Sequence, residues 1–501
     1  MIDDILDELE ADTAVETGAK FAAVTARYLE GTRRGGGQVS TPRSPEDLAL
    51  RFDEPMPRTG RSIDEVLDRL ERDVIADANR YCHPMYMGHQ TSAPLASGIW
   101  MESVISALNQ SLAVQEMSPT ATAIEHRLVR WFSDLVGYGA ESGGTMTSGG
   151  TEANFTALLA ARNHALPDAW ENGVGDDPPF IVYGEHAHYG VTRAIEQLGL
   201  GRRRGIPISS RDYRMDVDVL LSELERLKAG GRRVMALVAT AGSTATGSFD
   251  DLESIADICR ERDLWLHVDG AHGASALLSA RPPRALGALR HARTLAWDPH
   301  KGMLLPLAAG TLLARNAGDL DGAFAQQAPY LFSDRGVAHG ETTAPTLLLD
   351  QGVRSFQCSR RADVLKVWFT IQRHGSSGLG KLYDHLCATA RVLHDAIEER
   401  PEFENLHEPE SNILCFRYLG TRSSGGTGHT RSEQERIDAV NRELRTSYNR
   451  HGTGWITATV LGGRPVLRVT MMNPRTDPAH VRALLDGLVV EAKKIEEKGT
   501  R

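Results

Sequence analysis

The chain has 501 residues, with 56 lysines and arginines against 66 aspartates and glutamates, and a formal net charge of -10. This acidic surplus argues against a protein that binds nucleic acid through its phosphates, because such proteins carry a basic surplus. With 41% hydrophobic and 24% charged residues, the composition is that of a globular protein with a large core. No apolar run reaches the ~18 residues of a membrane span, and the acidic N-terminus is unlike a signal peptide.

The five cysteines are scattered and include no C-x-x-C pair. That pattern argues against a disulfide framework or a zinc ribbon, and it favours a reducing compartment. We therefore expect a cytoplasmic protein.

The N-terminal segment, residues 1–95, is charged and helical in pattern. Apolar positions predict helices over 2–9, 21–29 and 63–78, and a Gly/Arg/Ser/Pro-rich stretch at 31–43 reads as a connector. None of these helices could bury a core alone. We expect the segment to pack on something larger, such as a second subunit.

Residues 96–385 alternate between short apolar strands and amphipathic helices. The predicted strands are 180–183, 234–240, 265–269, 295–298 and 308–314. The predicted helices between them include 151–164, 219–228 and 252–260. This alternation predicts an α/β domain with a mostly parallel sheet, covered by helices on both faces. In such sheets a ligand binds at the carboxyl ends of the strands.

Residues 386–501 have a different, α+β pattern and predict a smaller C-terminal domain. The expected elements are a helix at 388–399, a strand at 412–418, a helix at 432–448, a strand at 466–471 and a closing helix at 479–496.

Four loops at predicted strand ends carry unusual polar residues. The first, Thr147-Ser148-Gly149-Gly150-Thr151-Glu152-Ala153-Asn154, leads directly into a helix. Small residues at a helix N-terminus let main-chain N–H groups approach a phosphate, although a plain glycine turn has the same pattern. The second, Gly184-Glu185-His186-Ala187-His188, could bind a metal, stack an imidazole on a ring-shaped ligand, or do neither.

The other two loops carry an acid and a lysine. In His267-Val268-Asp269-Gly270-Ala271-His272 the histidines and the acid could hold a metal. However, strand alternation places His267 and Asp269 on one face and His272 beyond the strand, and the acid could instead pair with a protonated ring nitrogen. Lys301, in Trp297-Asp298-Pro299-His300-Lys301-Gly302, suits Schiff-base formation, although a surface lysine in a turn is the commoner case. Together, the loops supply the groups that a pyridoxal phosphate site needs.

Three of these loops and His188 resemble the signature set of the group II pyridoxal-phosphate decarboxylases, and the resemblance runs from about residue 45 to about residue 485. That family includes glutamate, aspartate 1-, cysteine-sulfinate, diaminobutyrate and aromatic amino-acid decarboxylases. The resemblance implies the aspartate-aminotransferase-like fold (fold type I), with pyridoxal 5'-phosphate as cofactor and a small-molecule amino-acid substrate.

The resemblance also implies a role for individual residues. Lys301 would bind the cofactor covalently, Asp269 would pair with its pyridine nitrogen, and His188 and Ala271 would pack on its two faces. The residues expected to hold the phosphate are Gly150, Thr151 and His300, with Ser243 or Thr244 near the ring or the phosphate. A loop tyrosine, Tyr330, would return a proton after carbon dioxide leaves, which favours simple decarboxylation over oxidation.

The substrate is expected to meet His89, Thr91 and Arg468, the last of which resembles the family's arginine that holds the substrate α-carboxylate. These residues suit an acidic substrate such as aspartate, glutamate or cysteine sulfinate, although His89 could equally be structural. Diaminobutyrate or aromatic substrates, transamination and decarboxylation-dependent oxidation remain alternatives. The family resemblance further implies a homodimer with the active site at the subunit interface and swapped N-terminal segments.

Overall fold

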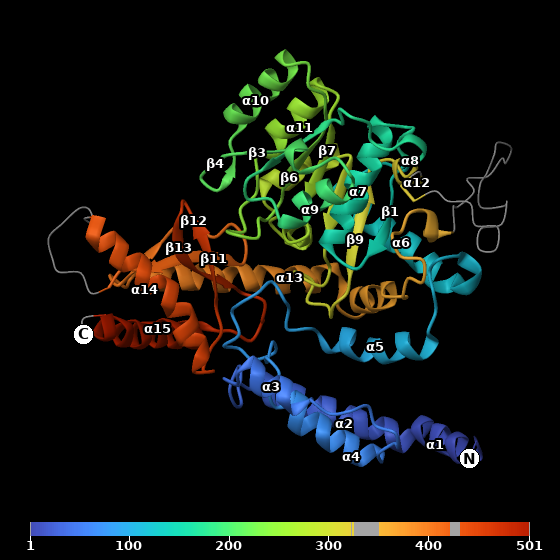
Figure 1. The fold of residues 1–501 in the computed structure, drawn as a ribbon, viewed down its shortest axis with the longest axis vertical. Coiled ribbons are helices and arrows are strands. Elements are labelled where there is room, and N and C mark those ends of the chain that lie inside the picture. Colours follow the sequence, from blue (N-terminus) through green and yellow to red (C-terminus); the bar gives the residue numbers. More distant parts are fainter. Residues whose placement is uncertain (1, 322, 325–349, 421–430, 500–501) are drawn as a thin grey trace. The chain divides into compact units, whose positions relative to one another are not determined.

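The computed structural model describes residues 2–321, 323–324, 350–420 and 431–499 (Figure 1). The chain forms two compact units. The larger unit comprises Gln90–Ala390 with Pro409–Ile413, and the smaller comprises Met1–His89, Arg391–Glu408 and Leu414–Arg501. The division into segments 1–95, 96–385 and 386–501 stays a prediction.

The larger unit is built on a mostly parallel sheet with the strand order β1-β9-β8-β7-β6-β2-β3. Its strands are β1 (Gly143–Thr147), β2 (Phe180–Gly184), β3 (Gly205–Ile208), β6 (Val234–Thr240), β7 (Trp265–Asp269), β8 (Thr294–Trp297) and β9 (Gly310–Ala314). The neighbouring pairs from β8 to β3 are parallel, whereas β9 is antiparallel to both β8 and β1. The parallel strands therefore end at one edge of the sheet.

Helices cover both faces of this sheet, as the alternation along β6 shows. Ala236 and Val238 pack with the helices of one face, whereas Leu237 and Ala239 pack with those of the other. The first face carries α7 (Gly150–Ala165) and α9 (Tyr189–Gln197), and the second carries α6 (Pro119–Val136), α10 (Val217–Ala229) and α11 (Leu252–Glu261). The predicted covered sheet is confirmed.

The remaining elements of this unit are short or peripheral to the sheet, apart from one long helix. They are α5 (Ala96–Leu108), α8 (Ala169–Asn172), β4 (Ser210–Arg211), β5 (Arg214–Met215) and α12 (Gly318–Asp321). The long helix α13 (Val364–Glu398) is interrupted at Gly375, whose φ of 67° is left-handed. The sequence pattern predicted only the last part of α13, from residue 388.

Two differences from the predicted elements have local causes. Helix α10 begins two residues earlier than expected because the Asp216 carboxylate accepts hydrogen bonds from the N–H groups of Asp218 and Val219. Strand β1 was missed because its glycines are poor strand formers. They are needed here, since a Cβ on Gly144 would lie only 2.4 Å from the oxygen of Leu312.

The smaller unit contains a second sheet with the order β10-β11-β13-β12. Its strands are β10 (Phe403–Asn405), β11 (Ile413–Tyr418), β12 (Thr457–Leu461) and β13 (Arg464–Thr470), and its C-terminal helices are α14 (Arg431–Arg450) and α15 (Pro478–Gly499). Its N-terminal helices are α1 (Ile2–Thr13), α2 (Val15–Arg33), α3 (Pro45–Arg51) and α4 (Ile63–Arg69). In the part of the chain that the structure describes, no helix is long and apolar enough to cross a membrane.

A buried ion pair fixes β1 against the rest of the larger unit. Glu125 on α6 lies 2.9 Å from a guanidinium nitrogen of Arg360, and the two side chains are 0% and 5% exposed. The other oxygen of Glu125 accepts a hydrogen bond from the N–H of Met146, and Arg360 donates to the Met146 carbonyl. Both partners thus hold the strand that leads into α7.

We predict that Glu125→Ala lowers the free energy of unfolding by about 3–5 kcal/mol, because it leaves the Arg360 guanidinium buried without its counter-ion. Denaturant unfolding followed by circular dichroism measures this. The matched control is Glu223→Ala, which removes the surface partner of Arg226 on α10 and should cost less than about 1 kcal/mol beyond any change in helix propensity. Equal losses in the two variants would contradict the prediction.

Candidate active site

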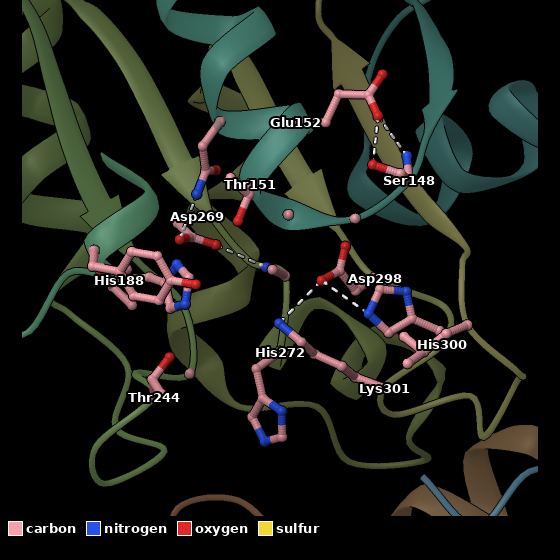
Figure 2. A pocket seen from close by; sticks show the side chains of 18 residues that line it. Ser148, Thr151, Glu152, His188, Thr244, Asp269, His272, Asp298, His300 and Lys301 are labelled. Atoms are coloured by element: carbon pink, nitrogen blue, oxygen red, sulfur yellow. Dashed lines mark hydrogen bonds and ion pairs between the residues drawn. The ribbon is translucent and has the colours of Figure 1, made fainter. Parts of the chain in front are cut away.

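A cavity of about 370 Å³ opens at the carboxyl ends of the parallel strands of the larger unit. Side chains from the loops after β1, β2, β6, β7 and β8 line it, and Figure 2 shows several of them directed into the same space. The predicted site residues among them are Gly150, Thr151, His188, Thr244, Asp269, Ala271, His300 and Lys301. Loops far apart in the sequence therefore meet where the strand order predicts a ligand site.

The first side of the cavity is the N-terminus of α7. The first N–H groups of a helix have no acceptor within the helix, and they face outward with the positive end of the helix dipole. Gly150 cannot carry a side chain here, because its Cβ would lie 2.8 Å from the Cβ of Ala271 and 3.2 Å from Oδ2 of Asp298. A Cβ on Gly310 would likewise lie 2.5 Å from the Cα of Gly149. This close packing leaves main-chain donors exposed to an anion.

The second side is Asp269, at the end of β7 and 5% exposed. Its Oδ1 accepts a hydrogen bond from the N–H of Ala271 at 3.1 Å, and its Oδ2 accepts one from the side-chain amide of Asn154 at 2.8 Å. Asn154 stands on α7, so this bond joins the helix to the strand. The carboxylate is held in one orientation at the cavity wall.

A chain of buried hydrogen bonds continues behind Asn154. Because its amide nitrogen donates to Asp269, its oxygen accepts from Nε2 of His267 at 2.9 Å. Nδ1 of His267 then accepts from the hydroxyl of Thr294 at 2.9 Å, and that hydroxyl accepts from the indole N–H of Trp265 at 3.0 Å. Every donor in this series of hydrogen bonds points toward Asp269.

Burial keeps His267 uncharged. Desolvation lowers its pKa to about 4, although the nearby Asp269 carboxylate opposes the shift. His267 and Asp269 lie on one face of β7, as strand alternation predicts, but they are linked through Asn154. Among the described residues no group of three or more His, Cys, Asp or Glu side chains is placed to hold a metal ion.

His188 is the N-cap of α9 and lines the same cavity. Its Nδ1 accepts a hydrogen bond from the N–H of Gly190 at 3.1 Å, which fixes the ring. Desolvation lowers the pKa of His188, against the raising effect of the Asp269 carboxylate. The ring is therefore a neutral, planar surface at neutral pH.

The third side combines Lys301, Asp298 and His300. The Lys301 amine lies 3.0 Å from Oδ2 of Asp298, and Nε2 of His300 lies 3.5 Å from the same oxygen (Figure 2). Nδ1 of His300 lies 2.7 Å from the carbonyl of Ala309. Desolvation lowers the pKa of His300, although Asp298 raises it.

Other predicted site residues lie elsewhere. Ser243 does not line this cavity: its hydroxyl contacts that of Thr246 at 2.9 Å within a turn. Thr91 belongs to the larger unit and precedes Ser92, whose hydroxyl bonds to the carbonyls of His300 and Leu305 at 3.0 Å each. Tyr330 lies outside the described residues, so its role stays a prediction.

His89 and Arg468 both belong to the smaller unit. The segment before His89 pairs with the small sheet, since the N–H of Met87 donates to Trp455 and the N–H of Thr470 donates to Met87. Arg468, on β13, is 6% exposed and donates to the Thr457 hydroxyl at 3.3 Å. Burial lowers the pKa of His89, and the positive charges of Arg468 and Arg445 lower it further.

The sequence patterns did not single out two residues that shape the cavity. Asn154 appeared only as the end of the glycine-rich motif. It lies four residues after Gly150, on the same face of the helix, and this spacing could have indicated that it faces β7. Asp298 appeared only as a neighbour of Lys301. Its spacing of three residues from Lys301 in a turn could have indicated their ion pair.

The donors and acceptors of the cavity fit pyridoxal phosphate. The N-terminus of α7, where glycines leave the main-chain N–H groups accessible, suits a phosphate. The fixed carboxylate of Asp269 suits a protonated pyridine nitrogen. Lys301 offers the amine that reacts with an aldehyde. Each of these features lies within the larger unit.

Comparison with known proteins agrees with this chemistry. Residues 45–419 match the pyridoxal-dependent decarboxylase conserved domain. The L-2,4-diaminobutyrate decarboxylase of Rhizobium meliloti is 33% identical over 89% of this chain and 86% of its own. The cysteine sulfinic acid decarboxylase of Mus musculus is 30% identical over 93% of each chain.

Solved structures share the fold. A crystal structure of mouse CSAD has a TM-score of 0.87 and 27% sequence identity, covering 96% of this chain and 99% of that one. Tryptophan decarboxylase of Catharanthus roseus, at 20% identity and a TM-score of 0.84, shares the architecture over 96% of this chain and 98% of its own. The predicted fold type I architecture is confirmed.

We predict that Asn154→Leu, a change of little volume, lowers the free energy of unfolding by about 2–4 kcal/mol. It removes the donor to Asp269 and leaves the N–H of His267 buried without an acceptor. Thermal unfolding measures the loss. Adding His267→Phe should cost less than the two single losses together, since both ends of one bond are then gone. Strict additivity would count against the hydrogen-bond chain.

Proposed function

The chain belongs to the pyridoxal-dependent decarboxylase family and is a pyridoxal-phosphate-dependent amino-acid decarboxylase; we propose that its substrate is an L-amino acid with an acidic side chain. The products are then carbon dioxide and the corresponding amine. The observation that carries the choice of substrate is the positive character of the surroundings of His89, to which Arg468 and Arg445 contribute.

The positions of the cavity residues support the roles that we assign to them. Pyridoxal phosphate, when bound, supplies an electron sink for the bond that breaks at the substrate Cα. Lys301 provides the amine that attaches the cofactor, and Gly150 and Thr151 offer main-chain donors to its phosphate. Asp269 holds the proton on the pyridine nitrogen, supported by its two hydrogen bonds from Ala271 and Asn154.

His188 and Ala271 provide the surfaces between which the ring lies. Because its pKa is lowered by burial, His188 is neutral and adds no positive charge beside the protonated ring. His300 and Thr244 line the same cavity and complete the polar groups available to the cofactor. Tyr330 is the proposed donor of the proton that replaces carbon dioxide at Cα.

The choice of an acidic substrate rests on charge. Arg468 is buried, and desolvation lowers its pKa because it disfavours the charged guanidinium. A substrate carboxylate that binds there recovers part of the lost solvation through charge-assisted hydrogen bonds. His89 and Thr91 are the proposed contacts of a second anionic group. A diamino acid would bring a cation to the same surroundings.

A second candidate substrate is L-2,4-diaminobutyrate. It is favoured by the 33% identity to the Rhizobium meliloti enzyme that carries this activity in its name. The relatives thus include enzymes named for acidic and for basic substrates, and the choice between them depends on the residues around His89.

We also propose a cytoplasmic homodimer. The exposed apolar side chains of α1 support association, since Ile2, Ile5, Leu6 and Leu9 are 50–64% exposed. None of the five cysteines, all of which the structure describes, forms a disulfide, which suits a reducing compartment.

The cofactor assignment is tested with Lys301→Ala. The purified wild-type protein should absorb visible light, and the variant should lose this absorption after gel filtration and lose kcat by about a thousandfold or more. The exposed Lys228→Ala is the control and should retain both properties. A colourless wild-type protein reconstituted with the cofactor would overturn the assignment.

The substrate is tested by offering aspartate, glutamate, cysteine sulfinate, diaminobutyrate and tryptophan, and measuring carbon dioxide and amine. We expect equal amounts of both products and the highest kcat/KM with one of the acidic substrates. His89→Gln should lower kcat/KM for that substrate by about tenfold, the worth of one hydrogen bond to a charged group, while diaminobutyrate turnover changes little. A keto acid product would indicate transamination, hydrogen peroxide would indicate oxidation, and preference for diaminobutyrate would select the second candidate.

A further inference from the structure

The cavity that receives an anionic cofactor is itself rich in acids. Glu152, Asp269 and Asp298 line it, whereas Lys301 is the one lysine or arginine among its described lining residues. The other two acids differ from Asp298 in their surroundings. Glu152 is only half-buried and its Oε2 accepts hydrogen bonds from the N–H and hydroxyl of Ser148 and from the side-chain amide of Gln357, whereas its Oε1 has no partner among the described residues. Asp269 faces the proposed pyridine site, and both of its oxygens accept hydrogen bonds. Asp298 is the acid that lies beside Gly150 at the N-terminus of α7, which we call the phosphate cradle.

Asp298 lies at the cradle with one oxygen unused. The side chain is 1% exposed, and its Oδ2 would touch a Cβ placed on Gly150 at 3.2 Å. Oδ2 also faces Lys301 and His300, but the buried Oδ1 has no hydrogen-bond partner among the described residues. A buried carboxylate oxygen without a partner is costly, and a donor or a proton must satisfy it.

A phosphate at this helix N-terminus would bring a second anion next to Asp298. Two anionic oxygens in contact cannot both stay charged at low cost, and such pairs hold a proton in common. The Lys301 amine and Nε2 of His300 both lie at Oδ2 of Asp298, so neither satisfies the unused Oδ1 when a second anion arrives. We propose that Asp298 couples cofactor binding to the uptake of a proton, which its carboxyl shares with the cofactor phosphate.

This inference rests on the proposed cofactor site. When the carboxyl of Asp298 and the phosphate share one proton, the protonated carboxyl donates a hydrogen bond to a phosphate oxygen. An asparagine amide at the same position could donate the same hydrogen bond without taking up a proton. Asp298 is therefore a cofactor-binding residue, and it makes the affinity of the protein for the cofactor depend on pH. The other titratable groups that face it are His300 and Lys301 on its own loop, Asp269 and His272 after β7, His188 on α9 and Glu152 on α7.

Neighbouring histidines are the competing source of proton uptake. Burial lowers the pKa of both His188 and His300, so both are neutral at neutral pH and could accept a proton when a phosphate arrives. Asp298→Asn separates the possibilities, because it keeps the shape and removes only the carboxylate. A histidine would still take up its proton in that variant.

The experiment uses the full chain freed of cofactor and titrated with pyridoxine 5'-phosphate, which has no aldehyde and leaves the Lys301 amine unreacted. Isothermal titration calorimetry in buffers of different ionisation enthalpy counts the protons taken up. We expect the wild-type protein to take up about one proton more than Asp298→Asn at about pH 8, where free phosphate is a dianion. Its Kd should rise with pH by up to about tenfold per unit, while that of the variant stays nearly constant.

Pyridoxine without phosphate is the matched ligand control, and it should bind to the wild-type protein without the extra proton. This comparison needs no variant, so it remains decisive if Asp298→Asn does not fold. Equal proton uptake by the two proteins, or by the two ligands, would overturn the role of Asp298. Failure of pyridoxine 5'-phosphate to bind at all would instead contradict the placement of the cofactor.

Discussion

The hydrogen bond from the Asn154 amide to the Asp269 carboxylate is the contact on which the geometry of the cavity depends. It joins the first turns of α7 to the end of β7, and the glycine cradle belongs to the same helix turn. This bond and the close packing of Gly150 against Ala271 together fix the distance from the N-terminus of α7 to the acid. His267 fixes the orientation of that side chain from behind, and burial keeps His267 neutral, so that no competing charge is introduced near Asp269.

Much of this arrangement could be predicted from local patterns. Strands β6 and β7 were predicted with their observed bounds because β6 is an apolar run that follows two arginines and β7 alternates apolar and polar residues up to Asp269. The polar strand-end residues, including His188, Asp269 and Lys301, meet as the rule for parallel sheets requires. Strand β1 was not predicted because its glycines are required by a neighbouring strand. The Leu312 oxygen lies too close to Gly144 for a side chain, and no local sequence pattern reveals such a contact.

Side-chain networks were harder to predict than strand ends. The pairing of Asn154 with His267 joins residues 113 positions apart, and it depends on how α7 crosses β7. The prediction that Ser243 or Thr244 lies near the ring or the phosphate illustrates the same difficulty, since Thr244 lines the cavity whereas the Ser243 hydroxyl contacts that of Thr246 in a turn. Spacing along the chain indicates which residues come near a site, but the direction of each side chain depends on tertiary contacts.

The division of the chain into two compact units also bears on how this enzyme could change. The side chains that line the cavity belong to the larger unit, whereas His89 and Arg468 belong to the smaller one. Each set therefore packs within its own unit. With the proposed substrate contacts His89 and Arg468, a duplicated gene could acquire a new substrate through changes in the smaller unit while selection preserves the residues of the cavity, which is a simple route to a family of enzymes named for chemically opposite amino acids.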